Sequence, residues 1–224
     1  PTTEHIKANE LHDFMWYQVP PLPGSEEAYV EVYEQLRSFK AWGLDNLVIN
    51  HCHDVWEDAN GRTSLSSIGS ESKGGNDALI EYLDAVQDLG YQFTLPAGYT
   101  EISPEDEVYS AEHTAIGSDG NPIATNPNRF LLKTSTAIDF AGSHLPKLFE
   151  RFNSSGLFLF GHTTTTASTR IDYDCNNDSG SSFAKSWEQE RLLLAKLQSI
   201  ADQNSRISIS DGGSHWLYSG LISS

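Results

Sequence analysis

The sequence predicts an α/β fold of the (β/α)-barrel type, a TIM-like barrel with parallel strands inside and helices outside. Apolar runs of strand length alternate with amphipathic helical segments about five times, at intervals of roughly 40 residues. The run 156–160 (Gly-Leu-Phe-Leu-Phe) has no polar alternation, which is typical of a strand buried on both faces of a parallel sheet. An open α/β sheet of about five or six strands is the alternative fold.

Each expected element has its own sequence signal. The strands are the apolar runs 14–17, 46–50, 91–95, 130–133, 157–161 and 207–209. The helices are expected over 25–43, over 74–90, through 140–149 and over 181–203. Ser25 followed by two glutamates favours a helix start, and Gly43 favours a helix end. Residues 100–128 form an excursion that is longer than ordinary connections, and such loops commonly carry function.

The chain is shorter than a typical complete (β/α)-barrel. An eight-unit barrel takes about 250 residues, whereas this sequence of 224 residues stops just after a strand and its loop. We therefore expect one domain over residues 1–224 that forms an incomplete TIM-like barrel.

The net charge of −17 narrows the class of partner. A nucleic-acid-binding protein needs a cationic face to displace counterions, and anionic membranes repel an acidic surface. We expect neither partner. The sequence shows neither an apolar stretch of about 20 residues nor a signal peptide after Pro1. Secreted and cytoplasmic locations both stay open, as does the oligomeric state.

Polar and aromatic side chains follow each predicted strand, at the end where α/β barrels place their chemistry. They are His51, His53, Asp54 and Trp56; Tyr99 and Glu101; His162, Arg170, Asp172 and Asp174; and Asp211, His215 and Trp216. Loops after parallel strands converge on one face, so these groups are expected to share a cleft. Aromatic rings stack on sugar faces, and two carboxyl groups supply an acid and a nucleophile or base. The pattern therefore indicates a carbohydrate substrate, with no cofactor.

A series of short motifs strengthens this interpretation. They are Gly74-Gly75, Gly98-Tyr99-Thr100-Glu101-Ile102, Asp119-Gly120, Phe158-Leu159-Phe160-Gly161-His162-Thr163, Asp172-Tyr173-Asp174 and Asp211-Gly212-Gly213-Ser214-His215-Trp216. In order and spacing, over roughly residues 35 to 222, the series resembles glycoside hydrolases of the endo-α-N-acetylgalactosaminidase type. That resemblance implies a TIM-barrel catalytic domain that cleaves O-glycosidic bonds.

The resemblance also implies roles for individual residues, and the sequence departs from the family pattern at three places. One is Pro96-Ala97-Gly98-Tyr99, which lacks the acid of the family's His-Asp-Asn-Tyr. Asp211 occupies the acid/base position, where the family has glutamate, and Phe160 occupies the position of the nucleophilic aspartate. Phenylalanine cannot attack an anomeric carbon, so the second catalytic carboxylate is expected from Asp54, Glu101, Asp172 or Asp174. Carboxyl groups about 5 Å apart favour retention, and groups about 6.5–9.5 Å apart favour inversion. The residues expected to bind substrate are His53, Trp56, Tyr99, His162, Asp174, His215 and Trp216.

Two alternatives stay open at this point. His51 and His53 are two residues apart, so on a strand end both side chains would point to one side and bind a metal, as in amidohydrolase-like barrels. The other alternative is a relative without catalysis that still binds carbohydrate through Trp56, Tyr99 and Trp216.

Overall fold

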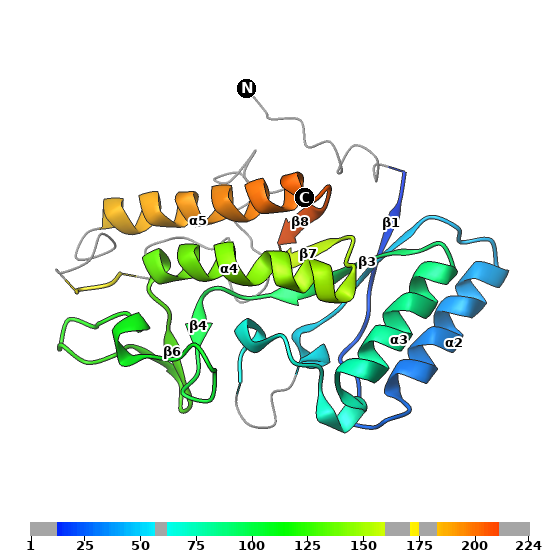
Figure 1. Ribbon diagram of the computed structural model, residues 1–224, viewed down its shortest axis with the longest axis horizontal. Helices are drawn as coiled ribbons and strands as arrows, with labels where there is room; N and C mark the ends of the chain where they lie inside the picture. Colours follow the sequence, from blue (N-terminus) through cyan, green and yellow to red (C-terminus); the bar gives the residue numbers. More distant parts are fainter. Residues whose placement is uncertain (1–12, 57–61, 160–170, 175–182, 211–224) are drawn as a thin grey trace.

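Five parallel strands form the central sheet, and they are arranged in the order in which they occur in the chain. The computed structural model describes residues 13–56, 62–159, 171–174 and 183–210. The strands are β1 (Met15–Gln18), β2 (Leu47–Asn50), β3 (Gln92–Ala97), β7 (Gly156–Leu159) and β8 (Ile207–Ser210). A doubly wound sheet reverses its strand order at a switch point, whereas a barrel adds each strand beside the previous one. The order β1-β2-β3-β7-β8 therefore supports a partial TIM-like barrel (Figure 1).

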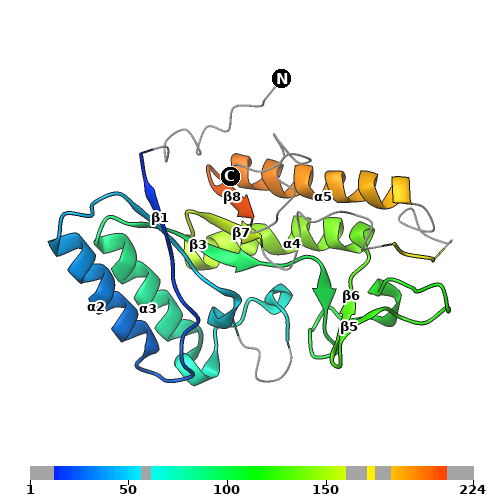
Figure 2. The same ribbon diagram turned by 180° about the vertical axis from the view of Figure 1, so that it is seen from behind.

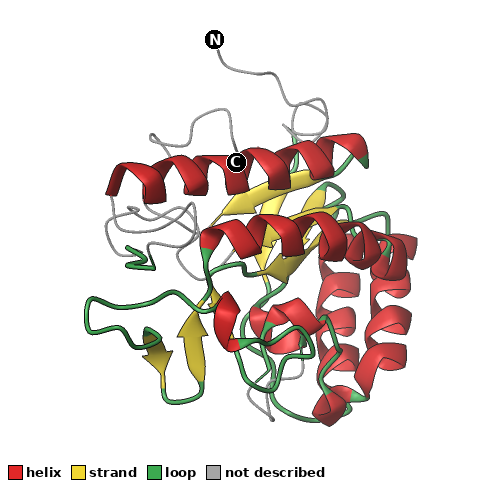
Figure 3. Ribbon diagram, turned by 60° about the vertical axis from the view of Figure 1, so that its left-hand side comes forward, coloured by secondary structure: helices red, strands yellow, loops and turns green. Residues whose placement is uncertain are grey.

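Four long helices connect the parallel strands, as the alternation in the sequence predicts. They are α2 (Ala28–Ala41), α3 (Gly75–Asp88), α4 (Thr134–Phe152) and α5 (Phe183–Gln203). Helices α2 and α3 lie side by side, and α4 packs along α5 (Figures 1 and 3). The predicted strands 14–17, 46–50, 91–95, 157–161 and 207–209 overlap the observed ones, with ends displaced by one or two residues.

The two faces of the sheet carry different residues, because side chains alternate along a strand. Ile49, Phe93 and Leu157 belong to the large core that the helices cover. Val48, Ile207 and Ile209 form a separate cluster and mark the opposite, concave face of the sheet. Each fully buried aliphatic or aromatic side chain stabilises the fold by about 1.5–3 kcal/mol, so the helix-facing core dominates stability.

The excursion between β3 and α4 forms a second, antiparallel sheet of three strands. Its order is β4 (Glu101–Ile102), β6 (Arg129–Leu131) and β5 (Ala124–Asn126), seen below the main sheet in Figure 2. The predicted strand 130–133 is thus found over 129–131, but outside the parallel sheet. The reason is a tight turn, in which the side chain of Asn126 accepts a hydrogen bond from the backbone N–H of Asn128 at 3.1 Å.

Short 3₁₀ helices shape the loops at the carboxyl-terminal ends of the strands. They are η1 (His53–Val55), η2 (Ser64–Ser66), η3 (Glu71–Lys73) and η4 (Ala111–His113). In the part of the chain that the structure describes, no helix is both long and apolar enough to cross a membrane.

Candidate functional site at the carboxyl ends of the strands

The described carboxylates of the predicted site follow three strands of the parallel sheet. Asp54 lies in η1 after β2, Glu101 begins β4 after β3, and Asp172 and Asp174 follow β7. Parallel strands end at one edge of a sheet, so these loops belong to the same side of the fold. Five further residues of the predicted site lie outside the described residues: Phe160, His162, Asp211, His215 and Trp216.

Asp54 is held by backbone and lysine contacts. Its Oδ2 accepts a hydrogen bond from the backbone N–H of Leu22 at 2.7 Å and lies 3.7 Å from Lys73 Nζ. The almost completely buried Lys73 also donates to the Asp54 carbonyl oxygen at 2.6 Å. The carboxylate therefore fixes the proline-rich segment after β1 against the end of β2, and these bonds already occupy one of its two oxygens.

Glu101 is the most accessible of the four described carboxylates, with its side chain 33% exposed. Its Oε2 lies 3.5 Å from Arg129 Nη1, across the antiparallel sheet. Arg129 also donates through Nη2 to the carbonyl oxygen of Arg62 at 3.2 Å. Both side chains of this ion pair are partly exposed to solvent, so the pair contributes little to stability. The Glu101 carboxylate therefore keeps oxygen lone pairs that can accept hydrogen bonds from a ligand.

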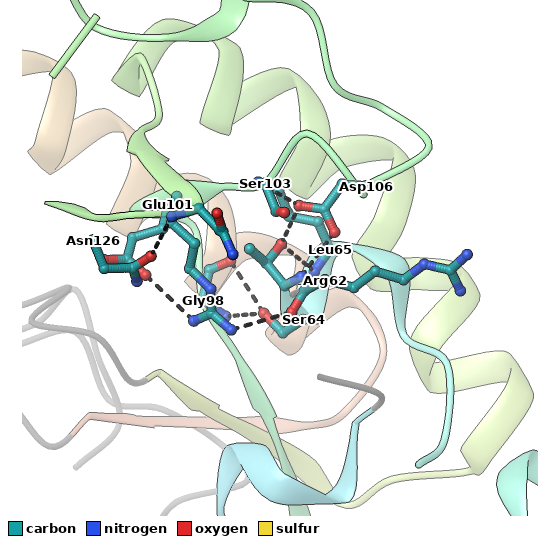
Figure 4. Close-up of polar contacts among 11 residues, drawn as sticks. Arg62, Ser64, Leu65, Gly98, Glu101, Ser103, Asp106 and Asn126 are labelled. Carbon is teal, nitrogen blue, oxygen red and sulfur yellow. Dashed lines mark hydrogen bonds and ion pairs between the residues drawn. The ribbon is translucent and has the colours of Figure 1, made fainter. Parts of the chain in front are cut away.

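Asp106 was not among the predicted site residues, but it is a buried carboxylate that joins two loops of this side (Figure 4). It accepts hydrogen bonds from Thr63 N, Thr63 Oγ1, Ser66 Oγ and Ser103 N, at 2.8, 2.7, 2.9 and 2.8 Å. Such charge-assisted bonds fix the loop after β2 relative to the loop after β3. The signal in the sequence was weak, because Asp106 stands within a run of acidic residues.

Asp172 and Asp174 anchor the loop after β7. The Asp172 side chain, in a residue only 2% exposed, accepts from the backbone N–H of Ile116 at 2.8 Å and of Asp174 at 3.0 Å. Asp174 forms a 2.6 Å ion pair with Lys133, the residue that precedes α4. Both aspartates therefore join the β7 loop to the excursion.

The two described aromatic residues expected to stack on sugar are packed inside the protein. Trp56 is 2% exposed, donates through Nε1 to the Pro96 carbonyl oxygen at 2.8 Å, and packs on Phe152. Tyr99 is 1% exposed, and its hydroxyl lies 3.0 Å from His144 Nδ1. Burial raises the pKa of the Tyr99 hydroxyl. The expected stacking by Trp56 and Tyr99 is therefore corrected: neither ring face is open to a ligand.

His51 points toward α3, and both its ring nitrogens are engaged. Nδ1 lies 3.0 Å from the Thr94 carbonyl oxygen, and Nε2 lies 3.0 Å from the Tyr82 hydroxyl. Burial lowers the pKa of His51 to about 4. His53 lies in η1 on the surface, beyond the strand. The proposed His51–His53 metal pair is therefore wrong, because His51 has no free nitrogen for a metal. Among the described residues, no group of three metal-binding side chains occurs.

A row of polar side chains on the concave face also escaped sequence analysis. Gln18, Asn50 and Thr94 are register partners across β1, β2 and β3. Thr94 Oγ1 donates to Asn50 Oδ1 at 2.6 Å, and Gln18 Nε2 lies 3.0 Å from Cys52 Sγ. The missed signal was a polar residue at the carboxyl end of β1 and of β2, and a threonine inside β3.

Comparisons with known proteins concern the fold. No family model matches the chain, and no curated protein matches it. An α-N-acetylgalactosaminidase from Bifidobacterium bifidum, solved with GalNAc, superposes with a TM-score of 0.72 and 12% identity, covering 94% of this chain and 36% of that one. An α-galactosidase from Thermus thermophilus superposes with a TM-score of 0.61 and 12% sequence identity, covering 97% of this chain and 43% of that one. A maltogenic α-amylase from Thermotoga neapolitana superposes with a TM-score of 0.59 and 12% sequence identity, covering 96% of this chain and 48% of that one.

These similarities define a glycoside hydrolase-like fold, here a curled, parallel half-barrel. The chain spans between 36% and 48% of the length of these three structures.

Proposed function

We propose that this chain is a glycoside hydrolase-like protein that binds carbohydrate at the carboxyl ends of its parallel strands and acts on O-glycosidic bonds. The observation that carries the proposal is the chain-ordered parallel half-barrel, in which acidic residues follow β2, β3 and β7. The similar fold of an α-N-acetylgalactosaminidase, an α-galactosidase and a maltogenic α-amylase supports carbohydrate as the class of substrate.

In this proposal, two carboxylates share the reaction. Asp211 protonates the leaving oxygen, and Glu101 is the nucleophile or the base that activates water. The choice of Glu101 rests on its partial exposure and its single, long ion pair with Arg129. Asp54 and Asp172 already accept backbone hydrogen bonds, so we assign them to shaping the loops around the substrate. The other residues that we propose to bind the carbohydrate are His53, Asp174, His162, His215 and Trp216.

The test is hydrolysis of a panel of 4-nitrophenyl α-glycosides by the wild type and by three variants. We expect Glu101→Gln and Asp211→Asn each to lower kcat/KM by at least 100-fold, since each removes a catalytic carboxylate. Glu105→Gln is the matched control, because Glu105 is exposed in the same loop. Equal hydrolysis by all four proteins would remove both carboxylates from the mechanism.

A second candidate function is carbohydrate binding without catalysis. The observation that favours it is the phenylalanine at position 160, where the resembling family has its nucleophile. In that case the wild type binds glycans but hydrolyses none of the panel. Gain of hydrolysis in Phe160→Asp, with no activity in Phe160→Asn, would identify a site that lacks only its nucleophile.

A further inference from the structure

The polar row of Gln18, Asn50 and Thr94 lies on the face of the sheet that the helices leave uncovered. Along β1, Tyr17 points toward α2 and packs edge-on against Phe39 at 5.2 Å, so its neighbour Gln18 points to the other face. Along β2, Ile49 belongs to the helix-facing core, so Asn50 also points to the other face. Thr94 shares the face of its partner Asn50, as their side-chain hydrogen bond requires.

The position of this row along the strands matches the candidate site. Gln18 and Asn50 are the last residues of β1 and β2, at the edge from which the loop with Asp54 leaves, whereas Thr94 lies inside β3, three residues before its end. On the same face, one row nearer the amino-terminal edge, β2 has Val48. Val48 has Gln92 as its register partner in β3, so both rows of this face include an amide, and the amides of Gln18 and Asn50 are those at the edge of the sheet where the proposed substrate binds.

Each amide of the row has one end that the described residues leave unpaired. Thr94 occupies Asn50 Oδ1, and no described residue accepts a hydrogen bond from Asn50 Nδ2, although Asn50 is only 9% exposed. Gln18 Nε2 donates to Cys52 Sγ and to the Asn50 carbonyl oxygen at 3.4 Å, which leaves Oε1 as a free acceptor. Two neighbouring strands therefore present one free donor and one free acceptor side by side.

We propose that Gln18 and Asn50 bind the hydroxyl groups of a neutral sugar, with Asn50 Nδ2 donating to one hydroxyl oxygen and Gln18 Oε1 accepting from another hydroxyl. Thr94 is a positioning residue, because its hydroxyl holds the Asn50 amide in the orientation that presents Nδ2. Hydroxyl groups both donate and accept, so they satisfy this pair, whereas a sugar carboxylate would face the Gln18 oxygen. This inference rests on the proposed function and adds the residues that bind the sugar.

Asn50→Asp is the decisive variant. An aspartate keeps the size of asparagine and an oxygen for the Thr94 hydroxyl, but it replaces the Nδ2 donor by a second acceptor. Gln92→Glu is the matched control, because Gln92 is on the same face at the amino-terminal end of β3 and pairs with Val48. Gln18→Met removes the acceptor and keeps the length of the side chain.

The experiment measures Kd by saturation-transfer NMR titration with methyl α-D-galactopyranoside, methyl α-D-glucopyranoside and methyl 2-acetamido-2-deoxy-α-D-galactopyranoside. We expect a Kd at least tenfold higher in Asn50→Asp and in Gln18→Met, a change below twofold in Gln92→Glu, and similar Tm values throughout. Wild-type affinity in Asn50→Asp and Gln18→Met would overturn this inference and leave the proposed function standing. Binding of none of the three sugars by the wild type would overturn the proposed function, and this inference with it.

Discussion

The carboxylate of Asp106 accepts two hydrogen bonds from Thr63, one from the backbone N–H at 2.8 Å and one from Oγ1 at 2.7 Å. Residues 63 and 106 belong to the loops after β2 and after β3, so this pair joins two loops of the candidate site. Its near-complete burial means that the donors have no alternative partner in water.

Asp106→Asn is expected to lower the free energy of unfolding by about 2–4 kcal/mol, because the amide replaces one acceptor oxygen by an NH2 donor and leaves two of the buried donors without an acceptor. Urea denaturation at neutral pH measures this change. Glu105→Gln makes the same chemical change at the exposed neighbour and is expected to stay within about 0.5 kcal/mol of the wild type. Equal stability of the two variants would contradict the structural role of Asp106.

The fold is expected to lose stability in mild acid because of two histidines, the buried His51 and the half-buried His144. Burial lowers the pKa of His51 and of His144 to about 4 in each case, and Lys147 adds to the effect at His144. An unfolded chain binds these protons near pH 6.5, so the native state, which does not bind them, is destabilised as the pH falls from about 6.5 to about 4. The loss approaches about 3 kcal/mol per histidine at the acid end.

The measurement is the free energy of unfolding at several pH values between 4 and 7. Replacing His144 by glutamine is expected to reduce the slope of stability against pH by up to one bound proton in this range. An unchanged slope in His144→Gln would show that this histidine binds its proton in the native state as readily as in the unfolded chain.

Gly156 is expected to tolerate no side chain. A Cβ atom there would overlap Cγ1 and the carbonyl oxygen of Ile207, the residue that pairs with it in β8. Gly156→Ala is therefore expected to cost about 2–3 kcal/mol, since the backbone oxygen cannot move without breaking the ladder. Gly142→Ala is the control: its Cβ would meet only Lys196 Cε at 3.5 Å, and alanine favours the helix by about 0.5–1 kcal/mol. Thermal unfolding that ranks the two variants in the opposite order would refute this packing.

The ion pair of Lys133 and Asp174 is expected to hold the loop after β7 in place. Both side chains are largely buried and 2.6 Å apart, so Asp174→Asn removes a charge that Lys133 needs. We expect faster amide hydrogen exchange at Tyr173, whose N–H donates to the Ile116 carbonyl oxygen at 2.8 Å, and unchanged exchange in β2. Unchanged amide exchange at Tyr173 would contradict this role of the ion pair and would mean that Asp172 alone holds the loop after β7.

The order of the parallel strands and helices was predictable from the sequence, because each element carries a local signal. Gly43 and Gly90 adopt positive φ angles, as helix-ending glycines do. The antiparallel sheet was not predictable, since β6 has the same apolar composition as a barrel strand and only its pairing with Glu101 and Ala124 distinguishes it.

The strand ends from which the candidate loops leave were predictable from the sequence, but the directions of the side chains in these loops were not. Polar residues follow the strands as expected, yet three of them turn inward: His51 bonds to Tyr82 of α3, Tyr99 to His144 of α4, and Trp56 to the Pro96 carbonyl oxygen of β3. A single sequence does not reveal such partners, because Tyr82 and His144 are separated from them by tens of residues. Asn50 gave no signal in the sequence because it is the last residue of a strand, whereas the loop after that strand begins at His51.

The most direct test of a carbohydrate site at the carboxyl ends of the strands is NMR chemical-shift mapping on the ¹⁵N-labelled chain. The ligand is the methyl α-glycoside that binds most tightly in the titration above. We predict shift changes at the backbone amides of Asn50, Thr100 and Glu101. Changes confined to the groove between α2 and α3, at Tyr33, Ala78 and Ala85, would contradict the account.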